Sequence, residues 1–442
     1  MKLPEHILFC IQRLEEAGYE AYVVGGCVRD ALLGIVPHDY DLCTCAEPEQ
    51  ICRLFSDHQL VLSGLKHGTV SVVMDKELVE ITTFRTEGAY LDNRHPQWVR
   101  FVDRVEEDLA RRDFTVNAMA YSPTRGLADP FGGREDLKNR VLRAVGDPEQ
   151  RFREDALRIL RGVRFSVRYD LAVEDETLKA MFSLVHLMDN LARERVFDEL
   201  CKLLPRVKAA DLLRFAPVVV QAVPELSPCL GFDQRSPHHA YDVYTHTAYV
   251  VEHVPPVLHL RWAALLHDIG KPLVFYTDEN GRGHFPDHGT ESAALADQVL
   301  RRLRAPNELR LQVRELVARH MLLPTEDPKL MRRRMSKLGA ERMEDLLALQ
   351  QADYDSKGVG APTRLFADAR ELVAQIRAQD ACLSLKDLAV NGKDLMELGF
   401  APGRHIGSCL NWLLEQVLEE NCINERQLLL EAAGRYLREE NP

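Results

Sequence analysis

Residues 23–44 read VVGGCVRDALLGIVPHDYDLCT and decide how the N-terminal part of the chain folds. The apolar run Ala21–Val24 predicts a buried strand. Gly25 and Gly26 follow it and predict a sharp turn, because glycine tolerates backbone angles that other residues avoid. The composition of residues 27–33 favours a short helix. The stretch therefore predicts a strand, a glycine turn and a helix in close succession.

Two aspartates, Asp39 and Asp41, flank Tyr40 in an alternating stretch that predicts a second strand. Side chains two residues apart on a strand point the same way, so the carboxylates are expected close together. Each would raise the pKa of the other unless a cation lay between them. Mg²⁺ binds carboxylate oxygens and substrate phosphates, and the helix start at Gly25 and Gly26 offers N–H groups to an anion. The pattern predicts a nucleotide site; the alternative is a surface turn with two solvated aspartates.

Composition limits the class of protein. The 442 residues predict two to four domains, and 46% hydrophobic with 28% charged residues is typical of soluble globular proteins. No apolar run reaches the roughly 18 residues of a membrane span. The ten cysteines form no C-x-x-C pair, which favours reduced thiols and a cytoplasmic location. With a net charge of −12, any nucleic acid must be held by a local basic surface. The oligomeric state stays open.

A third carboxylate is expected on a hairpin. The runs TVSVVM and LVEITTF, separated by DKE, are β-branched or alternating and predict two paired strands. Glu80, Thr82 and Phe84 would share one face of the second strand. If that strand packs beside the strand of Asp39 and Asp41, Glu80 reaches the same metal. The alternative is a solvated strand residue.

The segment RRDFTVN, residues 111–117, follows a helical stretch. Arg112 is a candidate triphosphate ligand, while Asp113 and Asn117 are candidates to contact a sugar hydroxyl or to hold the loop. In the alternative interpretation, the two arginines cap the helix and pair with Glu107 or Asp108.

Six arginines crowd residues 151–168. On a helix, Glu154, Arg158 and Arg161 would lie on one face, and Asp155 would stand three residues before Arg158. An aspartate and an arginine held rigidly in this way suit the Watson–Crick edge of a base. The alternative is a set of salt bridges on an exposed helix.

Six motifs occur in order between about residue 20 and residue 205. They are GGCVRDALLG, HDYDL, VEITTFRTEGAYLDNRHP, RRDFTVNAMA, DPFGGREDLKNRVLRAVGDPEQRFREDALRILRGVRF and LARERVFDEL. Together they resemble the bacterial-type (class II) tRNA nucleotidyltransferase family, which includes CCA-adding enzymes and poly(A) polymerases. The resemblance implies that Asp39 and Asp41 bind catalytic Mg²⁺, with Glu80 as third carboxylate.

The same resemblance implies a nucleotide-binding set. Its members are Gly25, Gly26, Arg29, Asp30, Arg112, Asp113, Asn117, Glu154, Asp155, Arg158 and Arg161. Within it, Glu154, Asp155 and Arg158 match the protein template that reads the bases of CTP and ATP. Residues 193–195, Arg-Glu-Arg, match a motif that braces the template helix.

The segment from Arg85 to Val99 resembles the flexible loop of family members that add the terminal A, and residues 384–442 resemble a tail that contacts the tRNA elbow. The resemblance implies full CCA addition to tRNA 3′ ends from CTP and ATP. Poly(A) synthesis, or addition of A alone to tRNA, is the alternative. A tRNA-binding module with an inactive site is a second alternative, and the intact Asp39, Asp41 and Glu80 argue against it.

A second series of residues resembles the HD-domain metal-dependent phosphohydrolases. It consists, in order, of His246, His267, Asp268, His288, His320 and Asp353. Imidazole and carboxylate together suit Ni²⁺, Mn²⁺ or Co²⁺ better than Mg²⁺. The resemblance implies a phosphatase or 2′,3′-cyclic phosphodiesterase activity; the alternative is a structural helical insert with incidental histidines.

These expectations combine into an α+β fold. A nucleotidyltransferase head with a small mixed or antiparallel sheet and helices would be followed by all-α neck, HD and tail domains. The expected bounds are 1–140 for the head, 141–225 for the neck with its base template, 226–360 for the HD domain and 361–442 for the tRNA-binding tail.

Overall fold

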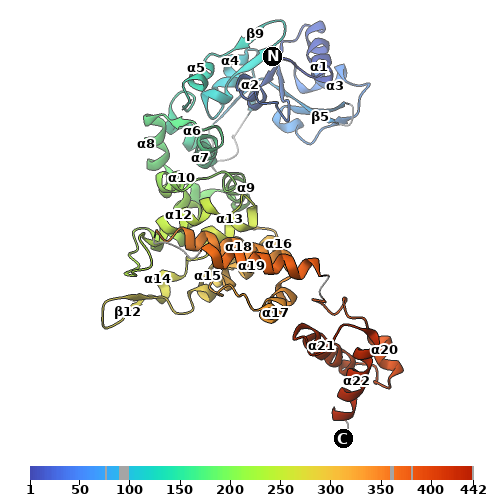
Figure 1. The fold of residues 1–442 in the computed structure, drawn as a ribbon. Helices are drawn as coiled ribbons and strands as arrows, with labels where there is room; N and C mark the ends of the chain where they lie inside the picture. The colour runs from blue at the N-terminus through green and yellow to red at the C-terminus, as the bar shows by residue number, and fades with distance from the viewer. Residues whose placement is uncertain (75–76, 89–98, 359–362, 380–381, 441–442) are drawn as a thin grey trace. The chain divides into compact units, whose positions relative to one another are not determined.

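The computed structural model describes residues 1–74, 77–88, 99–358, 363–379 and 382–440 (Figure 1). Its internal contacts divide the chain into two compact units. The first unit comprises Met1–Pro224 with Arg302–Arg304, and the second comprises Glu225–Arg301 with Ala305–Pro442. The nucleotidyltransferase-like motifs lie in the first unit and the histidine series lies in the second.

A seven-stranded mixed sheet forms the centre of the head, with strand order β3-β4-β5-β2-β1-β8-β9. The strands are β1 (Ala21–Val24), β2 (Leu42–Thr44), β3 (Leu60–Val61), β4 (Thr69–Met74), β5 (Glu77–Thr83), β8 (Ala120–Ser122) and β9 (Gly126–Ala128). β2 runs parallel to β5, and the other neighbouring strands pair antiparallel. The predicted mixed sheet and the β4–β5 pairing are confirmed.

The predicted strand–turn–helix stretch is confirmed, with one correction. β1 is fully buried and is followed by helix α2 (Gly26–Leu32). The second strand, however, begins at Leu42, so Asp39 and Asp41 precede it instead of lying within it. The reason is the partner strand: β1 ends at Val24, whose N–H donates to the Asp41 carbonyl, and Gly25 then turns the chain away. On the β1 side, pairing therefore ends at Asp41, although β5 begins at Glu77 on the other side of β2.

The two faces of β5 differ in burial. Val79, Ile81 and Thr83 are buried, whereas Glu80 is exposed and Thr82 is half-buried. The prediction that Phe84 shares the face of Glu80 is wrong, because the strand ends at Thr83 and Phe84 enters the core. There Phe84 packs with residues such as Tyr22 of β1.

Helices and two short sheets complete the first unit (Figure 1). The helices of the head are α1 (Glu5–Glu16), α3 (Pro48–Leu54), α4 (Val105–Ala110) and α5 (Gly133–Lys138). Those of the neck are α6 (Pro148–Glu154), α7 (Leu157–Tyr169), α8 (Asp175–Ser183), α9 (Arg193–Leu203), α10 (Ala209–Arg214) and α11 (Ala216–Ala222). The short sheets pair β6 (Arg85–Glu87) with β7 (Val99–Phe101) and β10 (Val141–Leu142) with β11 (Ala172–Val173). Most of the family loop expected at 85–99 lies outside the described residues.

The second unit is helical apart from the small hairpin of β12 (Tyr276–Thr277) and β13 (Gly283–His284) within its described residues. Its helices are α12 (Val243–His253), α13 (Leu258–Leu266), α14 (Lys271–Val274), α15 (His288–Arg302), α16 (Asn307–Arg319), α17 (Pro328–Leu338), α18 (Ala340–Asp355), α19 (Thr363–Ala378), α20 (Gly392–Glu397), α21 (Arg404–Leu418) and α22 (Arg426–Glu440). The C-terminal helices α20, α21 and α22 share a hydrophobic core. The predicted α+β class is confirmed, and the four domain bounds stay a prediction.

Candidate active sites

Asp39 and Asp41 border two hollows of the first unit. A cavity of about 500 Å³ has Asp39, Asp41 and Glu80 in its wall, so the structure brings the three predicted carboxylates to one place. The Asp39 side chain is 86% exposed. The pKa of Asp41 is raised by partial desolvation, which outweighs the nearby Arg112, and Asp39 raises it further. Desolvation and the two aspartates likewise raise the pKa of Glu80.

This mutual repulsion is what a divalent cation would relieve. The three carboxylates line one cavity but do not form a tight group of ligand atoms. Among the described residues, groups of three ligand atoms within 4.8 Å of one another occur only in the histidine series. The donor set Asp39, Asp41 and Glu80 therefore fits a hard cation that keeps waters and substrate oxygens in its shell, as Mg²⁺ does.

The second hollow is a cleft of about 740 Å³ that we call the basic cleft. Its wall consists of Gly25, Gly26, Arg29, Asp39, Asp41, Arg111, Arg112, Asp113, Asn117, Asp155, Arg158, Arg161, Arg164, Phe165, Arg168, Arg195 and Lys202. Nine of these side chains are basic and four are acidic. The cleft is thus positive although the chain carries a net charge of −12. Such local positive charge attracts phosphates and RNA.

A buried polar network fixes one wall of the basic cleft. The Asp113 carboxylate accepts from Arg161 at 2.6 and 2.9 Å and from the Asn117 amide at 3.0 Å. Arg29 donates to the Asn117 carbonyl oxygen and pairs with Asp30 at 2.7 Å. Although burial opposes ionisation, Arg161 and Asn117 lower the pKa of Asp113 to about 2. The network ties α2, the loop after α4 and α7 into one rigid wall.

Position 25 in the wall of the basic cleft requires glycine. Its φ of 78° lies in the left-handed region, and an added Cβ would come within 2.8 Å of Arg112 Nη1. Arg112 and Arg111 both pair with Asp108, at 3.4 and 2.8 Å. The alternative interpretation of these arginines as partners of an acidic helix residue is therefore confirmed for Asp108. Arg111 and Arg112 also line the basic cleft. Their ion pairs with Asp108 therefore hold the two side chains in the cleft wall.

The template residues differ from their predicted arrangement. The helix breaks at Asp155, whose φ of −141° and ψ of 102° are extended, so α6 and α7 are separate helices. Asp155 and Arg158 do not pair with each other. Asp155 accepts two hydrogen bonds from Arg195, at 2.7 and 3.3 Å, and Arg158 pairs with Glu154 at 2.7 Å and donates to the Arg111 carbonyl at 2.8 Å. The break lets the Asp155 carboxylate cap the start of α7 by accepting from the Leu157 N–H at 3.0 Å.

Residues 193–195, which match the brace motif, and the remaining predicted residues each make specific contacts in the structure. Arg195 of α9 holds Asp155, whereas Arg193 donates to the Asp189 carbonyl at 3.1 Å. Glu154 and Asp30 are absent from the wall of the basic cleft, and each instead pairs with an arginine that is part of it. Glu154 thus positions Arg158, and Asp30 positions Arg29.

Sequence reasoning missed several members of the basic cleft. Arg164 and Arg168 were visible in the arginine-rich run but had no assigned role, and Phe165 and Lys202 gave no signal. Phe165 lies beneath three guanidinium groups, with the carbon of Arg164 at 4.2 Å from the ring centroid and those of Arg161 and Arg29 at 5.2 and 5.3 Å. Arg161 and Arg164 share α7 with Phe165, whereas the Arg29 contact depends on how α2 meets α7, which no local pattern encodes.

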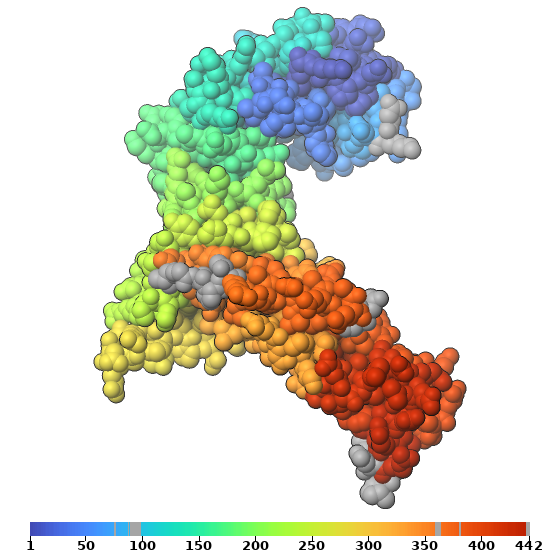
Figure 2. Space-filling view, in the orientation of Figure 1, coloured from blue at the N-terminus to red at the C-terminus, as the bar shows by residue number. Residues whose placement is uncertain are grey.

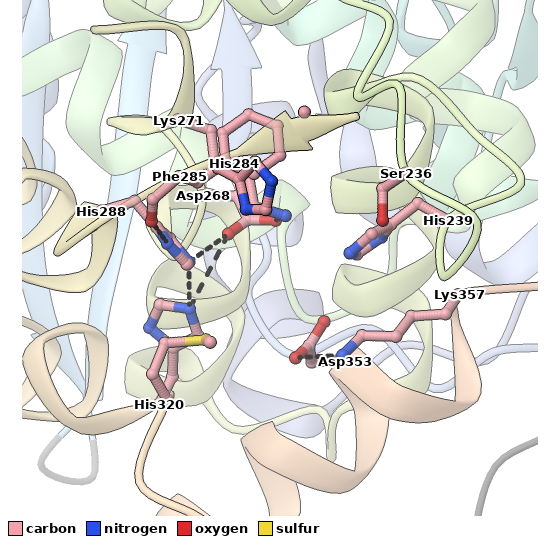
Figure 3. Close-up of a pocket in the computed structure, with 12 residues that line it drawn as sticks. Ser236, His239, Asp268, Lys271, His284, Phe285, His288, His320, Asp353 and Lys357 are labelled. Atoms are coloured by element: carbon pink, nitrogen blue, oxygen red, sulfur yellow. Dashed lines mark hydrogen bonds and ion pairs between the residues drawn. The ribbon is translucent and has the colours of Figure 1, made fainter. Parts of the chain in front are cut away.

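The second unit brings the whole histidine series together. We call His246, His267, Asp268, His288, His320 and Asp353 the histidine site; all six are buried. They come from α12, the end of α13, the start of α15, the end of α16 and α18. A cavity of about 210 Å³ opens onto four of them, Asp268, His288, His320 and Asp353 (Figure 3).

Asp268 stands at the centre and faces two groups of imidazoles. Its Oδ2 lies 3.2 Å from His267 Nε2 and 3.6 Å from His246 Nε2. Its Oδ1 lies 3.3 Å from His288 Nε2 and 3.7 Å from His320 Nε2, as the dashed lines in Figure 3 indicate. One carboxylate between two pairs of nitrogens has the form of a bridge between two cation positions.

The tautomers of the four imidazoles follow from their other nitrogens. Each Nδ1 faces a backbone carbonyl, at 2.8 Å for His267, 2.9 Å for His288, 2.7 Å for His320 and 3.3 Å for His246. A proton on Nδ1 leaves the Nε2 lone pair free, which is the form that binds metal. His267 Nε2 is buried and makes no hydrogen bond of acceptable geometry. The donor set therefore fits a transition metal.

The remaining groups add charge at this site. Asp353 Oδ1 lies 3.0 Å from His246 Nε2, and Lys357 lies 3.5 Å from the other carboxylate oxygen. Lys271 Nζ lies 2.7 Å from Asp268. Against the effect of burial, the nearby lysines and imidazoles lower the pKa of Asp268 and of Asp353. Lys357 and His239, which also face the cavity, were missed from the sequence.

Three family models match the chain. The poly A polymerase head domain matches residues 21–143, the RNA and SrmB-binding site of polymerase A matches residues 170–214, and tRNA nucleotidyltransferase domain 2 matches residues 289–433. The first covers the carboxylates and the glycine turn, and the last begins within α15. No helix in the described ranges has the length and apolar character required to cross a membrane.

Individual relatives extend the likeness to the full chain. The CCA-adding enzyme of Ligilactobacillus salivarius is 34% identical over 440 residues, which are 97% of this chain and 96% of that protein. The Streptococcus uberis enzyme is 50% identical over 206 residues, 46% of this chain and 51% of its own. The structure of the Bacillus stearothermophilus CCA-adding enzyme in complex with CTP is 29% identical, with a TM-score of 0.70 and full coverage of both chains. The predicted family is thus confirmed, and the chain belongs to the CCA-adding enzymes, a family of tRNA nucleotidyltransferases.

Proposed function

We propose that the chain adds C, C and A in turn to tRNA 3′ ends, using CTP and ATP. The observation that carries this proposal is the basic cleft, whose wall contains Asp39 and Asp41 together with nine basic side chains. CTP is the ligand named for the Bacillus stearothermophilus structure, and a solved Thermotoga maritima CCA-adding enzyme, 22% identical, is complexed with tRNA. The positive cleft suits both a triphosphate and an RNA backbone.

In this proposal Asp39, Asp41 and Glu80 hold Mg²⁺. Bound Mg²⁺ would favour ionisation of the attacking hydroxyl and neutralise charge on the departing pyrophosphate. The 3′-oxygen of the tRNA forms a bond to the α-phosphorus, the bond from that phosphorus to the bridging oxygen of the β-phosphate breaks, and the hydroxyl proton leaves to solvent. Arg29 and Arg112, on the two sides of Gly25, bind the triphosphate.

Base recognition falls to Asp155 and Arg158. Asp155 offers an acceptor and Arg158 offers donors, and each is held by another residue, Arg195 and Glu154 respectively. Because both side chains are held rigidly, they suit a pocket that recognises a base by its hydrogen-bonding groups rather than by its shape. In the structure, both terminal nitrogens of Arg158 donate hydrogen bonds to protein oxygens, one of Glu154 and one of Arg111. An incoming base must therefore compete with these two contacts.

The test is extension of a tRNA lacking its 3′ CCA by purified protein with Mg²⁺, CTP and ATP. Ordered addition of C, C and A supports the proposal. A homopolymeric A tail without C addition would establish the poly(A) polymerase alternative, and a single A on tRNA ending in CC would establish A addition alone. Tight tRNA binding with no extension would favour the inactive binding module.

We propose a second activity for the histidine site, metal-dependent hydrolysis of phosphate esters, including 2′,3′-cyclic phosphates. The observation that favours it is Asp268, which faces two pairs of imidazole nitrogens. His246, His267, Asp268 and Asp353 would hold one metal, and His288 and His320, with Asp268, the second. Bound Ni²⁺, Mn²⁺ or Co²⁺ would supply a water of lowered pKa as nucleophile.

For a 2′,3′-cyclic phosphate, the water oxygen forms a bond to phosphorus, and one ring bond from phosphorus to a ribose oxygen breaks. The released ribose oxygen takes up a proton, so the product is a phosphomonoester. Elemental analysis of purified protein, together with hydrolysis assays in each metal, tests this proposal. Absence of transition metal and of hydrolysis with all three metals would make residues 226–360 a structural helical insert with incidental histidines.

A further inference from the structure

The β12–β13 hairpin carries aromatic side chains to the mouth of the cavity at the histidine site. His284 and Phe285 form part of the cavity wall, as Figure 3 shows beside Asp268 and His288. Tyr276 stacks on His284, with ring centroids 5.2 Å apart and an interplanar angle of 20°. We call Tyr276, His284 and Phe285 the aromatic ledge. The hairpin projects from the helices of the second unit (Figures 1 and 2).

The ledge is held in place although it projects. Tyr276 and His284 are register partners across the hairpin, and His284 Nε2 lies 2.9 Å from the Asp278 carboxylate. Phe285 packs on Phe275 at 5.4 Å between ring centroids. At the base of the hairpin, an added Cβ on Gly283 would come within 2.1 Å of the Gln234 carbonyl oxygen, so the backbone is seated against its neighbour. The rings are therefore oriented before any ligand arrives.

The outer ring of the ledge is open to solvent. Tyr276 is 53% exposed, and its ring stacks on His284. A flat aromatic surface of this kind accepts a nucleobase, because stacking needs a π-face and no particular hydrogen-bond pattern. It lies beside a cavity whose wall also contains Lys271 and Lys357, two cations suited to a phosphate.

We infer that the aromatic ledge is a base-binding subsite of the histidine site. A nucleotide would stack its base on Tyr276 and His284 while its phosphate enters the cavity between Lys271 and Lys357. The preferred substrates are then nucleotides or RNA ends that carry a terminal cyclic or monoester phosphate, not base-free phosphate esters. This inference rests on the proposed hydrolase function, and it adds the residues that select the substrate.

The experiment compares phosphate esters of a nucleoside with phosphate esters of glycerol, which has neither base nor ribose. The full chain, loaded with Mn²⁺, Ni²⁺ or Co²⁺, is assayed with adenosine 2′,3′-cyclic phosphate and with glycerol 1,2-cyclic phosphate. A second pair, adenosine 3′-phosphate and glycerol phosphate, distinguishes cyclic from monoester substrates. The variants are Tyr276→Ala, His284→Ala and, as matched control, Tyr276→Phe, which keeps the ring.

The expected result is a preference of the wild type for the base-containing member of a pair. In Tyr276→Ala and His284→Ala, the ratio of kcat/KM between the two members should fall by about fivefold or more, chiefly through KM. Tyr276→Phe should keep the wild-type ratio. Hydrolysis of both members with ratios unchanged by either alanine variant overturns the base subsite alone. Hydrolysis of no substrate overturns the hydrolase function, and the subsite with it.

Discussion

The two sites of this chain organise carboxylates in opposite ways. In the first unit, Asp39 stands at an exposed edge of the basic cleft, and the nearby positive charge comes from arginines fixed by their own ion pairs. In the second unit, six ligand-type side chains converge in the interior, and Asp268 is only 1% exposed. The first site is open and incomplete without substrate, whereas the second is closed and nearly complete by itself.

This difference agrees with the chemistry of the metals that we propose for the two sites. Mg²⁺ keeps waters and takes oxygen atoms from substrate phosphates, so a few carboxylates at an open edge suffice. Transition metals are held by imidazoles whose orientation is set by hydrogen bonds at the far nitrogen, and such ligands need a rigid interior. We therefore expect each site to respond to its own mutations and not to those of the other.

The largest expected effect follows from removing an aspartate of the first site. Asp39→Asn and Asp41→Asn should each lower CCA addition by about 10³-fold or more, because the metal loses a charged ligand that stabilises the transition state. Primer extension on tRNA lacking CCA measures the loss. Hydrolysis by the histidine site is the control and should stay intact. Full addition by either variant would break the assignment of the open metal site.

The second largest effect should come from the closed site. His267→Ala combined with Asp268→Ala should reduce transition-metal affinity by more than about 100-fold and reduce hydrolysis to background, since both proposed metal positions lose a ligand. Elemental analysis and a phosphate-ester assay measure the two effects. CCA addition should survive. Its loss would mean that the two sites are coupled, against the independence that the comparison predicts.

A pH-dependent effect tests the rigid wall of the basic cleft. Arg161 and Asn117 lower the pKa of Asp113 from 3.8 to about 2 in the folded chain, so the ionised carboxylate stabilises the fold. That contribution is present above the unfolded pKa and is lost as pH falls from about 4 towards 2. Asp113→Asn should lower the free energy of unfolding of the first unit by about 2 kcal/mol at pH 7.

Calorimetry or denaturant unfolding at pH 7 and near pH 3 provides the measurement for Asp113. The difference between wild type and Asp113→Asn should shrink at the lower pH. Asp136→Asn is a suitable comparison, because Asp136 pairs with Arg143 at 3.2 Å outside the wall of the basic cleft. A difference for Asp113 that is independent of pH would show that its ion pair does not stabilise the wall.

The smallest expected effect concerns nucleotide choice. Arg158→Ala should raise misincorporation of UTP and GTP by about tenfold, because a good bidentate base contact contributes roughly 1–3 kcal/mol of discrimination. Single-nucleotide addition rates with all four triphosphates measure this. Arg153→Ala is the matched control, since Arg153 pairs with Glu149 at 3.4 Å and lies outside the cleft wall. Equal slowing of every nucleotide by Arg158→Ala would make its contact with Glu154 purely structural.

The positions where sequence reasoning failed share a cause. The strand expected at Asp39 and Asp41 begins only at Leu42, because its antiparallel partner β1 ends at Val24 and Gly25 turns the chain away. The predicted pairing of Asp155 with Arg158 is replaced by pairs with Arg195 and Glu154, because the helix breaks at Asp155 and Arg195 arrives from α9. In both cases a residue distant in sequence competes with a local pattern.

The sequence by itself determined the kinds of chemistry in this chain. Glycines before a short helix, paired aspartates, a run of arginines and an ordered series of histidines are local signals, because each depends on residue type and short spacing. The tertiary structure alone decided which of these groups meet. It joins Arg29, Asp113 and Arg161 into one wall, and it places Asp268 between two pairs of histidines from four helices or helix ends. Such contacts depend on how helices pack, and packing is set by the whole chain rather than by any one segment.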